Sequence, residues 1–401
     1  MLLSSPWQEQ IKPSALACSS HMKKLSSAIS LARKELILFI PKEKEELLAP
    51  HLGELDFISS TLEQRASQLE SFISHETDIN KIRWMEIYRE PMSNVVLTVA
   101  QLNVSDLLYE HLFKPRKTAI LCSATLTAHK GFAYFRNRMG MDEMAEDFPI
   151  AELIYPSPFD YKNRCLFLVP KDISFPTEIS FTEQAAKKIS SIIQISGGSC
   201  LILFTSYEML LSCYSMVTKM EGMHQYPLLK QGDAARQVLI DTVKSKEGHV
   251  LFATDSFWEG IDIPGEYLRS VVIVKLPFKV PSDPLFQAIS EVFEKKGLDP
   301  FKEYSLPLAL LKFKQGFGRL IRTKEDRGCV VCLDKRIMTK PYGRSFIKSI
   351  PACSALYEDT DVMLKEMKNF FIKTGECQSV PEPIHRTNEA TYQAEYLKDL
   401  G

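Results

Sequence analysis

The stretch VLFATDSFWEGIDIPGEYLRSVVIVKL, residues 250–276, contains two short apolar runs, 250–253 and 270–276, on either side of a loop of small, acidic and aromatic residues. Short apolar runs bounded by turn residues are typical of buried strands. Similar runs at 165–169, 200–204 and 329–333 alternate with helical stretches at 181–195, 206–220, 233–245, 283–296 and 304–314. This alternation predicts an α/β fold: a parallel sheet with helices on both faces and a ligand site at the carboxyl ends of the strands.

The chain before this region has a different pattern. From about residue 14 to 87, apolar residues recur every three or four positions, which predicts at least two long helices punctuated by Pro41, Pro50 and Gly53. Residues 118–122 predict a short buried strand, and the tail after Gly375 is polar. We therefore expect the sheet to be preceded by an α-helical region.

The composition narrows the class of protein. A chain of 401 residues, 45% hydrophobic and 25% charged, has room for two or three domains with a sizeable core. With a net charge of -1, nucleic acid would have to bind in a local basic groove. Nine cysteines without paired spacing indicate reduced thiols in a cytoplasmic protein, and no stretch approaches the roughly 20 apolar residues that span a membrane. Cys329 and Cys332 are three positions apart in a predicted strand, so their thiols should point to opposite faces and hold no metal.

Residues 315–322, Gln-Gly-Phe-Gly-Arg-Leu-Ile-Arg, contain two arginines three positions apart. At the start of a helix, Arg319 and Arg322 would lie on one face and could point at one anion. A guanidinium group is planar and always charged, and it suits the charge that develops on a transferred phosphoryl group. A solvated, basic start of a helix is the alternative. Gln315 and Gly318 accompany the pair and belong to the same candidate site.

The loop after residue 253 supplies acidic candidates. Glu259 and Asp262 could hold a ribose hydroxyl, orient a water or position an arginine, and Gly260 permits a close approach of the backbone. The alternative is a helix cap or a surface turn. Trp258 could stack on a base, or it could be a buried packing residue.

Two further segments carry hydroxyl groups. Thr205 and Ser206 follow a predicted strand, where they suit a contact with a nucleic-acid phosphate or, for Ser206, a helix N-cap. Ser123 and Thr125 could couple nucleotide and nucleic acid by exchanging hydrogen bonds, although a turn at the end of a strand would look much the same.

As a set, these motifs resemble the carboxyl-terminal half of the DinG branch of XPD-like superfamily 2 DNA helicases. The resemblance runs in order from about residue 90 to about 350 and rests on the motif set rather than on any one motif. The segments that carry it are Ser123–Leu126, Ser157–Tyr161, Phe204–Tyr207, Ser256–Gly265, Lys275–Phe278, Pro281–Pro284, Gln315–Arg322 and Asp326–Gly328.

The resemblance implies a role for each motif. Ser123 to Thr125 would be motif III, which links hydrolysis to strand movement, and Phe204 to Tyr207 would be motif IV. Glu259, Gly260 and Asp262 would belong to motif V, which touches nucleotide and DNA backbone. Gln315, Gly318, Arg319 and Arg322 would be motif VI, whose arginines meet the γ-phosphate of ATP between two RecA-like domains. Two positions depart from the family pattern: Asp255 stands where relatives usually carry glycine, and Cys122 where they often carry threonine.

The same resemblance implies a domain organisation. Residues 1–110 would be the end of an arch-like helical insertion and 111–155 a remnant of the first motor domain with motif III. Residues 156–385 would be the second RecA-like domain, and 386–401 a polar tail.

A helicase motor also needs a loop ending in Gly-Lys-Ser/Thr and an Asp-Glu-x-His motif, which bind the phosphates and Mg²⁺ of ATP. No Gly-Lys dipeptide occurs in the chain, and Asp142-Glu143-Met144-Ala145 lies in a helical context that does not fit the second motif. We expect both motifs, and the cysteines of the family's iron-sulfur cluster, to lie upstream of residue 1. The isolated chain is therefore expected to hydrolyse ATP poorly or not at all.

Two hypotheses follow. In the first, the chain is the carboxyl-terminal part of an ATP-dependent DNA helicase that acts on single-stranded or forked DNA. It would then be a piece of a longer chain, the product of a split gene, or a subunit completed by a separate polypeptide with the first motor domain. In the second, it is a non-catalytic nucleic-acid-binding or interaction module derived from a helicase domain. Retention of Arg319, Arg322, Glu259 and Asp262 favours the first, because a binding module gains nothing from residues that sense the γ-phosphate. The departure at Asp255 and the absence of the phosphate-binding half favour the second.

Overall fold

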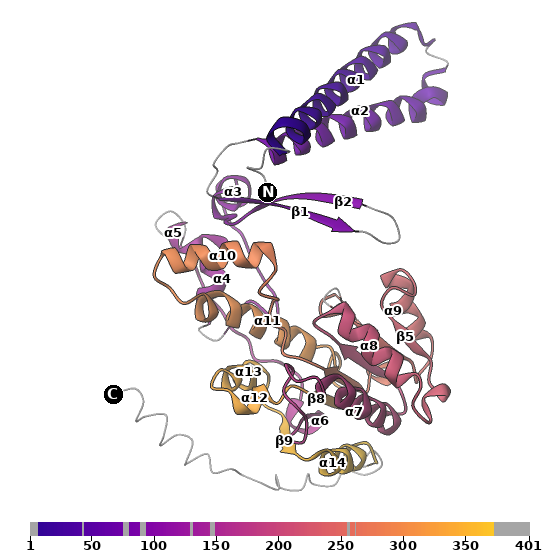
Figure 1. Cartoon of the computed structure of the whole chain (residues 1–401), viewed down its shortest axis with the longest axis vertical. Helices are drawn as coiled ribbons and strands as arrows, with labels where there is room; N and C mark the ends of the chain where they lie inside the picture. The colour runs from indigo at the N-terminus through magenta and orange to yellow at the C-terminus, as the bar shows by residue number, and fades with distance from the viewer. Residues whose placement is uncertain are drawn as a thin grey trace. The chain divides into compact units, whose positions relative to one another are not determined.

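The computed structural model describes residues 7–41, 44–74, 80–88, 94–128, 131–144, 149–254, 257–260 and 262–372 (Figure 1). The chain forms two compact units, Met1–Val104 with Ser282–Ile289 and Ser105–Pro281 with Ser290–Gly401. The polar tail predicted at 386–401, the last part of the domain predicted at 156–385, and Asp255 lie outside the described residues.

The first unit contains a helical hairpin and a β-hairpin. Helices α1 (Lys12–Phe39) and α2 (Glu45–Ile73) pack along each other through small polar residues, with Ser19, Ser26 and Ser59 buried between them. The hydroxyl of Ser26 donates to the Ser59 carbonyl over 2.9 Å. Only one of the expected breaks occurs, near Pro41, because Pro50 lies inside α2.

The prediction that helices extend to residue 87 is wrong. Strand β1 (Lys81–Tyr88) pairs antiparallel with β2 (Asn94–Gln101), with Lys81 opposite Gln101 and Tyr88 opposite Asn94. The sequence of β1 alternates polar and apolar residues through Lys81-Ile82-Arg83-Trp84, and β2 is rich in β-branched residues, so both suit a hairpin. Trp7, Phe72 and Ile73 form a small core in this unit, against which Val99 of β2 packs.

The second unit is built around a seven-stranded sheet in the order β5-β6-β4-β7-β8-β3-β9, and every neighbouring pair is parallel. The strands are β3 (Cys165–Pro170), β4 (Cys200–Leu203), β5 (Leu228–Lys230), β6 (Val250–Ala253), β7 (Ser270–Ile273), β8 (Gly328–Cys332) and β9 (Ser354–Glu358). The five predicted strands are confirmed. The two edge strands, β5 and β9, were missed because they are only half-buried and lack a continuous apolar run.

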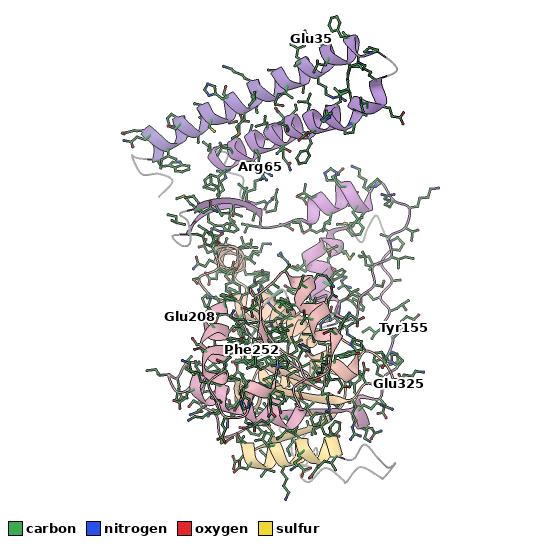
Figure 2. All side chains as sticks on the ribbon, turned by 90° about the vertical axis from the view of Figure 1, so that its right-hand side faces the viewer. Glu35, Arg65, Tyr155, Glu208, Phe252 and Glu325 are labelled. Carbon is green, nitrogen blue, oxygen red and sulfur yellow. The ribbon has the colours of Figure 1, made fainter. Side chains whose placement is uncertain are left out.

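Helices cover both faces of the sheet, as the sequence predicted. Helices α7 (Phe181–Ser196), α8 (Tyr207–Val217) and α14 (Thr360–Ile372) bury their apolar residues on one face. Helices α9 (Arg236–Ser245), α11 (Leu306–Phe317), α12 (Arg336–Thr339) and α13 (Gly343–Ser349) do so on the other. Figure 2 shows Phe252 of β6 inside this unit, while Glu208 and Glu325 lie at its surface. Further α-helices among the described residues of the unit are α3 (Ser105–Leu108), α4 (Ala133–Met139), α5 (Met141–Met144) and α6 (Tyr161–Arg164). Helix α10 runs over Pro284–Lys295.

Two predictions about residues near the sheet have opposite outcomes. Cys329 and Cys332 lie in the cores on opposite faces of the sheet, as their spacing predicted. The strand predicted at 118–122 does not form: Ile120 is 86% exposed, and within the described residues no strand pairs with this segment. An apolar run becomes a strand only where a neighbour accepts its backbone hydrogen bonds.

Candidate nucleotide and DNA site

The predicted site residues meet on two connections that lie over one face of the sheet. Residues 254–269 lead from the carboxyl end of β6 to the amino end of β7, and 318–327 lead from α11 to the amino end of β8. The prediction that all motifs lie at the carboxyl ends of the strands is therefore wrong for Arg319 and Arg322, which precede β8. Their connection reaches the loop after β6 by crossing the face that α11 covers.

Trp258 joins the two connections. Its side chain is fully buried, and its Nε1 donates to the Phe204 carbonyl over 3.2 Å. A Cβ atom on Gly316 of α11 would lie 2.8 Å from Cε3 of the indole, so only glycine lets the helix approach this closely. The packing alternative for Trp258 is thus correct, and stacking on a base is wrong because no face of the ring is exposed.

Arg319 is held by backbone carbonyls. Its Nε donates to the Trp258 carbonyl over 2.9 Å and to the Gln315 carbonyl over 3.2 Å. Helix α11 ends at Phe317, and the Gly318 amide donates to the Lys314 carbonyl over 2.9 Å. The two arginines therefore follow the end of a helix and do not begin one, and a turn, not a shared helical face, brings them together.

Electrostatic interactions show that the predicted charges share one location. The pKa of Arg319 is lowered to about 10, chiefly by burial; the neighbouring charges of Arg322 and Arg236 also lower it, while those of Glu259 and Asp262 raise it. The Arg322 Nε lies 4.0 Å from the Asp262 Oδ1, and the Asp262 side chain is 75% exposed. Three guanidinium groups face two carboxylates here, which leaves a net positive charge on a partly open surface.

Asp326 lies in one of the segments that carry the resemblance, but the sequence assigned it no role. Its buried carboxylate accepts from the backbone amides of Arg322, over 2.6 Å, and Thr323, over 2.8 Å, and from the Thr323 hydroxyl over 2.7 Å. Gly265 of the other connection packs against it, and a Cβ there would lie 2.5 Å from Oδ1. Asp326 thus fixes the backbone from which Arg322 extends. The sequence signals for this role are the motif segment Asp326–Gly328 and the position of an aspartate four residues after an arginine.

Arg236, at the start of α9, is a second addition. Its Nη2 donates to the Glu259 carbonyl over 2.7 Å, and its guanidinium lies 5.5 Å from the centre of the Phe257 ring. Gly260 has a φ of 62°, and a Cβ on it would lie 3.2 Å from the same Nη2. The glycine therefore serves the close approach that the sequence suggested, and the partner is an arginine from another element.

The hydroxyl segments are also described. The Ser206 side chain accepts from the Met209 amide over 3.3 Å and caps α8, which is the N-cap alternative, and Thr205 precedes it half-buried at the carboxyl end of β4. The Ser123 and Thr125 hydroxyls lie 3.2 Å apart. Two residues on, the Thr127 hydroxyl accepts from Lys314 Nζ over 3.3 Å, and burial lowers the pKa of that lysine. This contact connects the segment to α11, whose last turn contains Gln315.

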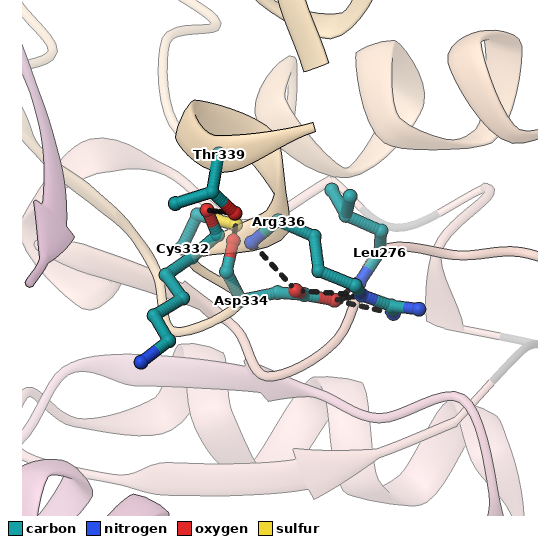
Figure 3. A network of polar contacts seen from close by, with 6 residues as sticks. Leu276, Cys332, Asp334, Arg336 and Thr339 are labelled. Atoms are coloured by element: carbon teal, nitrogen blue, oxygen red, sulfur yellow. Dashed lines mark hydrogen bonds and ion pairs between the residues drawn. The ribbon is translucent and has the colours of Figure 1, made fainter. Parts of the chain in front are cut away.

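A buried carboxylate also links the ends of two neighbouring strands of the sheet. The fully buried Asp334 accepts from the Leu276 amide over 2.9 Å, and from Arg336 Nε and Nη2 over 2.9 and 2.6 Å (Figure 3). Burial disfavours the charge on Arg336, but the hydrogen bonds with Asp334 outweigh it and raise its pKa. The network ties the end of β7 to the end of β8.

Metal-binding clusters and membrane-spanning helices are both absent from the described part of the chain. Within the described ranges, no cluster of three or more His, Cys, Asp or Glu side chains is arranged to hold a metal ion. No helix among the described residues combines the length and the apolar character that crossing a bilayer requires.

Comparison with known proteins agrees with this fold. Residues 189–353 match the family described as helicase C-terminal domain. The 3'-5' exonuclease DinG of Bacillus subtilis (strain 168) is 35% identical over 295 residues, which are 72% of this chain and 31% of that protein. The ATP-dependent DNA helicase YoaA of Escherichia coli (strain K12) is 34% identical over 288 residues, 72% of this chain and 44% of that protein. The chain thus spans less than half the length of these two relatives.

A solved structure of an XPD helicase has the same fold, with a TM-score of 0.51, 17% identity, and coverage of 79% of this chain and 56% of that chain. The class is therefore that of helicase C-terminal domains, with a RecA-like parallel sheet. Within that class, the region is of the DinG and XPD-like type in superfamily 2, as the motifs predicted.

Proposed function

We propose that this chain is the carboxyl-terminal part of an ATP-dependent DNA helicase. It would couple ATP hydrolysis to movement along single-stranded DNA and to unwinding when it is completed by the phosphate-binding half of the motor. The observation that carries the proposal is the convergence of Arg319 and Arg322 with Glu259 and Asp262 around one partly open, net positive surface.

The arginine positions suit γ-phosphate recognition. Arg319 is directed by two backbone carbonyls, and Arg322 extends from backbone that Asp326 holds, so the Arg319 guanidinium and the backbone of Arg322 are already fixed when an anion binds. A preorganised cation stabilises the charge that develops on a transferred phosphoryl group without reorganisation at the moment of reaction. Within this proposal Arg319, Arg322 and Gln315 are the catalytic residues, and Glu259, Gly260, Asp262 and Gly318 form the nucleotide-binding surface.

The residues present fit part of ATP and not all of it. Guanidinium groups are suited to a phosphate, whereas no Gly-Lys-Ser/Thr loop is encoded here to cradle the β-phosphate and to orient Mg²⁺. ATP with Mg²⁺ supplies the transferable phosphoryl group, and we assign most of its binding, and any iron-sulfur cluster, to the other half of the motor. A separate polypeptide with that half remains part of the proposal.

DNA is assigned to the hydroxyl segments. Thr205 and Ser206 stand at the carboxyl end of β4, and Ser123 and Thr125 are connected to α11 by the contact between Thr127 and Lys314. A change at the arginines could therefore reach the DNA-facing hydroxyls through one helix.

We propose 1–110 as the end of an arch-like insertion, 111–155 as the remnant of the first motor domain, 156–385 as the second motor domain, and the cytoplasm as the location.

Reconstitution tests the proposal. Purified 1–401 is expected to show little ATP hydrolysis alone, and to gain DNA-stimulated hydrolysis when mixed with the part of YoaA that it does not span. In the mixture, Arg319→Ala or Arg322→Ala should lower kcat by about 10³-fold, the lower range for an arginine finger. Arg65→Ala is the matched control, because this exposed arginine of α2 lies in the other unit and bonds the Gln68 side chain one helical turn away (Figure 2).

Binding to inorganic triphosphate gives a second measure that does not require reconstitution. The chain alone should bind triphosphate, and Arg319→Ala should weaken this binding at least tenfold. Magnesium-dependent, DNA-stimulated turnover by 1–401 alone would refute the assignment of the phosphate loop to another segment. Binding of single-stranded DNA that is indifferent to ATP and to Arg319 would instead establish the non-catalytic nucleic-acid-binding module.

A further inference from the structure

Two cysteines lie side by side at the amino ends of neighbouring strands. The parallel pairing of β3 with β9 places Leu166 opposite Ser354, so the preceding residues, Cys165 and Cys353, are the next pair in register. Strands in a sheet are about 4.8 Å apart, and disulfides join residues whose Cα atoms are about 4.4–6.8 Å apart. Residues in register on parallel strands also point to the same face, so the two thiols face each other.

Burial agrees with this register. Cys165 is fully buried in the core on the α11 face, and Cys353 is a partly buried residue that packs against the same core. A hydrogen bond between the thiols, with burial, raises the pKa of Cys165, and the same bond lowers the pKa of Cys353. The thiol that solvent can reach is thus the one whose thiolate is favoured.

Two other pairs of buried cysteines are not placed for pairing. Cys200 and Cys329 each stand in register with Ser270, on opposite sides of β7, so two strand spacings, about 9.6 Å, separate them. Cys329 and Cys332 lie on opposite faces of the sheet. Among these pairs of described residues, only Cys165 with Cys353 falls within disulfide range.

We propose that Cys165 and Cys353 form a redox-active pair that a hydroperoxide converts to a disulfide. The Cys353 thiolate attacks the peroxide, which is reduced: one oxygen is transferred to sulfur as a sulfenic acid, and the other leaves as water or alcohol after taking a proton. The Cys165 sulfur then displaces hydroxide from the Cys353 sulfur, and the Cys165 thiol proton joins the hydroxide, so that one water leaves as the disulfide forms. The bond would join edge strand β9 to β3 covalently.

This pair lies on the same side of the sheet as the arginine site. Tyr161 belongs to the same core; burial raises its pKa, and the charges of Cys165, Arg322 and Cys353 also act on it. Oxidation would therefore alter packing close to the backbone that carries Arg322. The proposal itself does not depend on the helicase assignment.

Peptide mapping of the full chain tests the proposal. The folded protein is treated with hydrogen peroxide, free thiols are blocked with N-ethylmaleimide during denaturation, and the product is cleaved with trypsin. We expect the peptides 165–171 and 349–365 to appear as one linked species that lacks two hydrogens and separates after reduction with dithiothreitol. Cys122→Ala, which removes an exposed thiol, should leave the yield of this species unchanged.

A second measurement tests the order of the steps. In Cys165→Ala, the Cys353 sulfenic acid should persist and be captured by dimedone, at least fivefold more than in the unaltered chain. The proposal would be overturned if, in the oxidised wild-type chain, Cys165 carried N-ethylmaleimide and was not linked to Cys353. Linkage of Cys165 to any other cysteine would also overturn it. Equal capture by dimedone in both chains would overturn the role of Cys165 as the resolving thiol.

Discussion

Asp326→Ala gives the most direct test of how this fold holds Arg322. The substitution leaves the Arg322 and Thr323 amides and the Thr323 hydroxyl without their acceptor. An orphaned buried donor costs about 1–3 kcal/mol, and water can reach the exposed Thr323, so we expect a loss of about 2–3 kcal/mol in the free energy of unfolding. Freed backbone at Arg322 should also weaken triphosphate binding about tenfold or more, which corresponds to about 1.4 kcal/mol.

Urea unfolding followed by Trp258 fluorescence measures the first effect. Trp7 and Trp84 lie in the other unit, so replacing both with phenylalanine leaves Trp258 as the reporter of this unit. Isothermal titration with triphosphate measures the second effect. Asp241→Ala is the control: Asp241 is an exposed aspartate that accepts from the Gln237 side chain, so the change should be within about 0.5 kcal/mol. A loss below about 1 kcal/mol together with an unchanged Kd would show that Asp326 does not position Arg322.

Three further predictions concern the surroundings of the site. Asp334→Ala leaves the Arg336 guanidinium and the Leu276 amide without their acceptor. The free energy of unfolding, measured in urea, should fall by about 3–5 kcal/mol. A fall of less than about 1 kcal/mol would contradict the network of Figure 3. Gly316→Ala places a methyl group 2.8 Å from the Trp258 ring. The free energy of unfolding should therefore fall by about 1–3 kcal/mol, and the tryptophan emission should shift. Unchanged emission would argue against this contact. Burial lowers the pKa of Arg319 from 12.5 to about 10, so between these values the unfolded chain holds more protons than the folded chain. The contribution of Arg319 to the free energy of unfolding therefore rises with pH over that range. The affinity for triphosphate should fall above about pH 10, because Arg319 then loses its charge. In Arg319→Gln, the part of this fall that comes from residue 319 should disappear.

The sequence was most informative where a local pattern carries the structure. The continuous apolar runs of β4, β6, β7 and β8 predicted central strands, because a strand covered on both faces has no polar side to present. The same reasoning failed at 118–122, where an apolar run has no partner strand among the described residues. It also missed β9, whose half-buried residues show no such run.

By itself, the sequence determined that a sheet of this kind forms, and it singled out the arginines at 319 and 322 and the acidic loop of the candidate site, but not Arg236 or Asp326. The tertiary structure decided how these groups are held: Arg319 bonds a carbonyl 61 positions away in the chain, and Arg236 reaches across 23 positions to the Glu259 carbonyl. It also decided that Trp258 is a packing residue and that Cys165 stands beside Cys353. Local patterns are set by the period of a helix or strand, whereas these contacts depend on which elements the core brings together, and no local period records that.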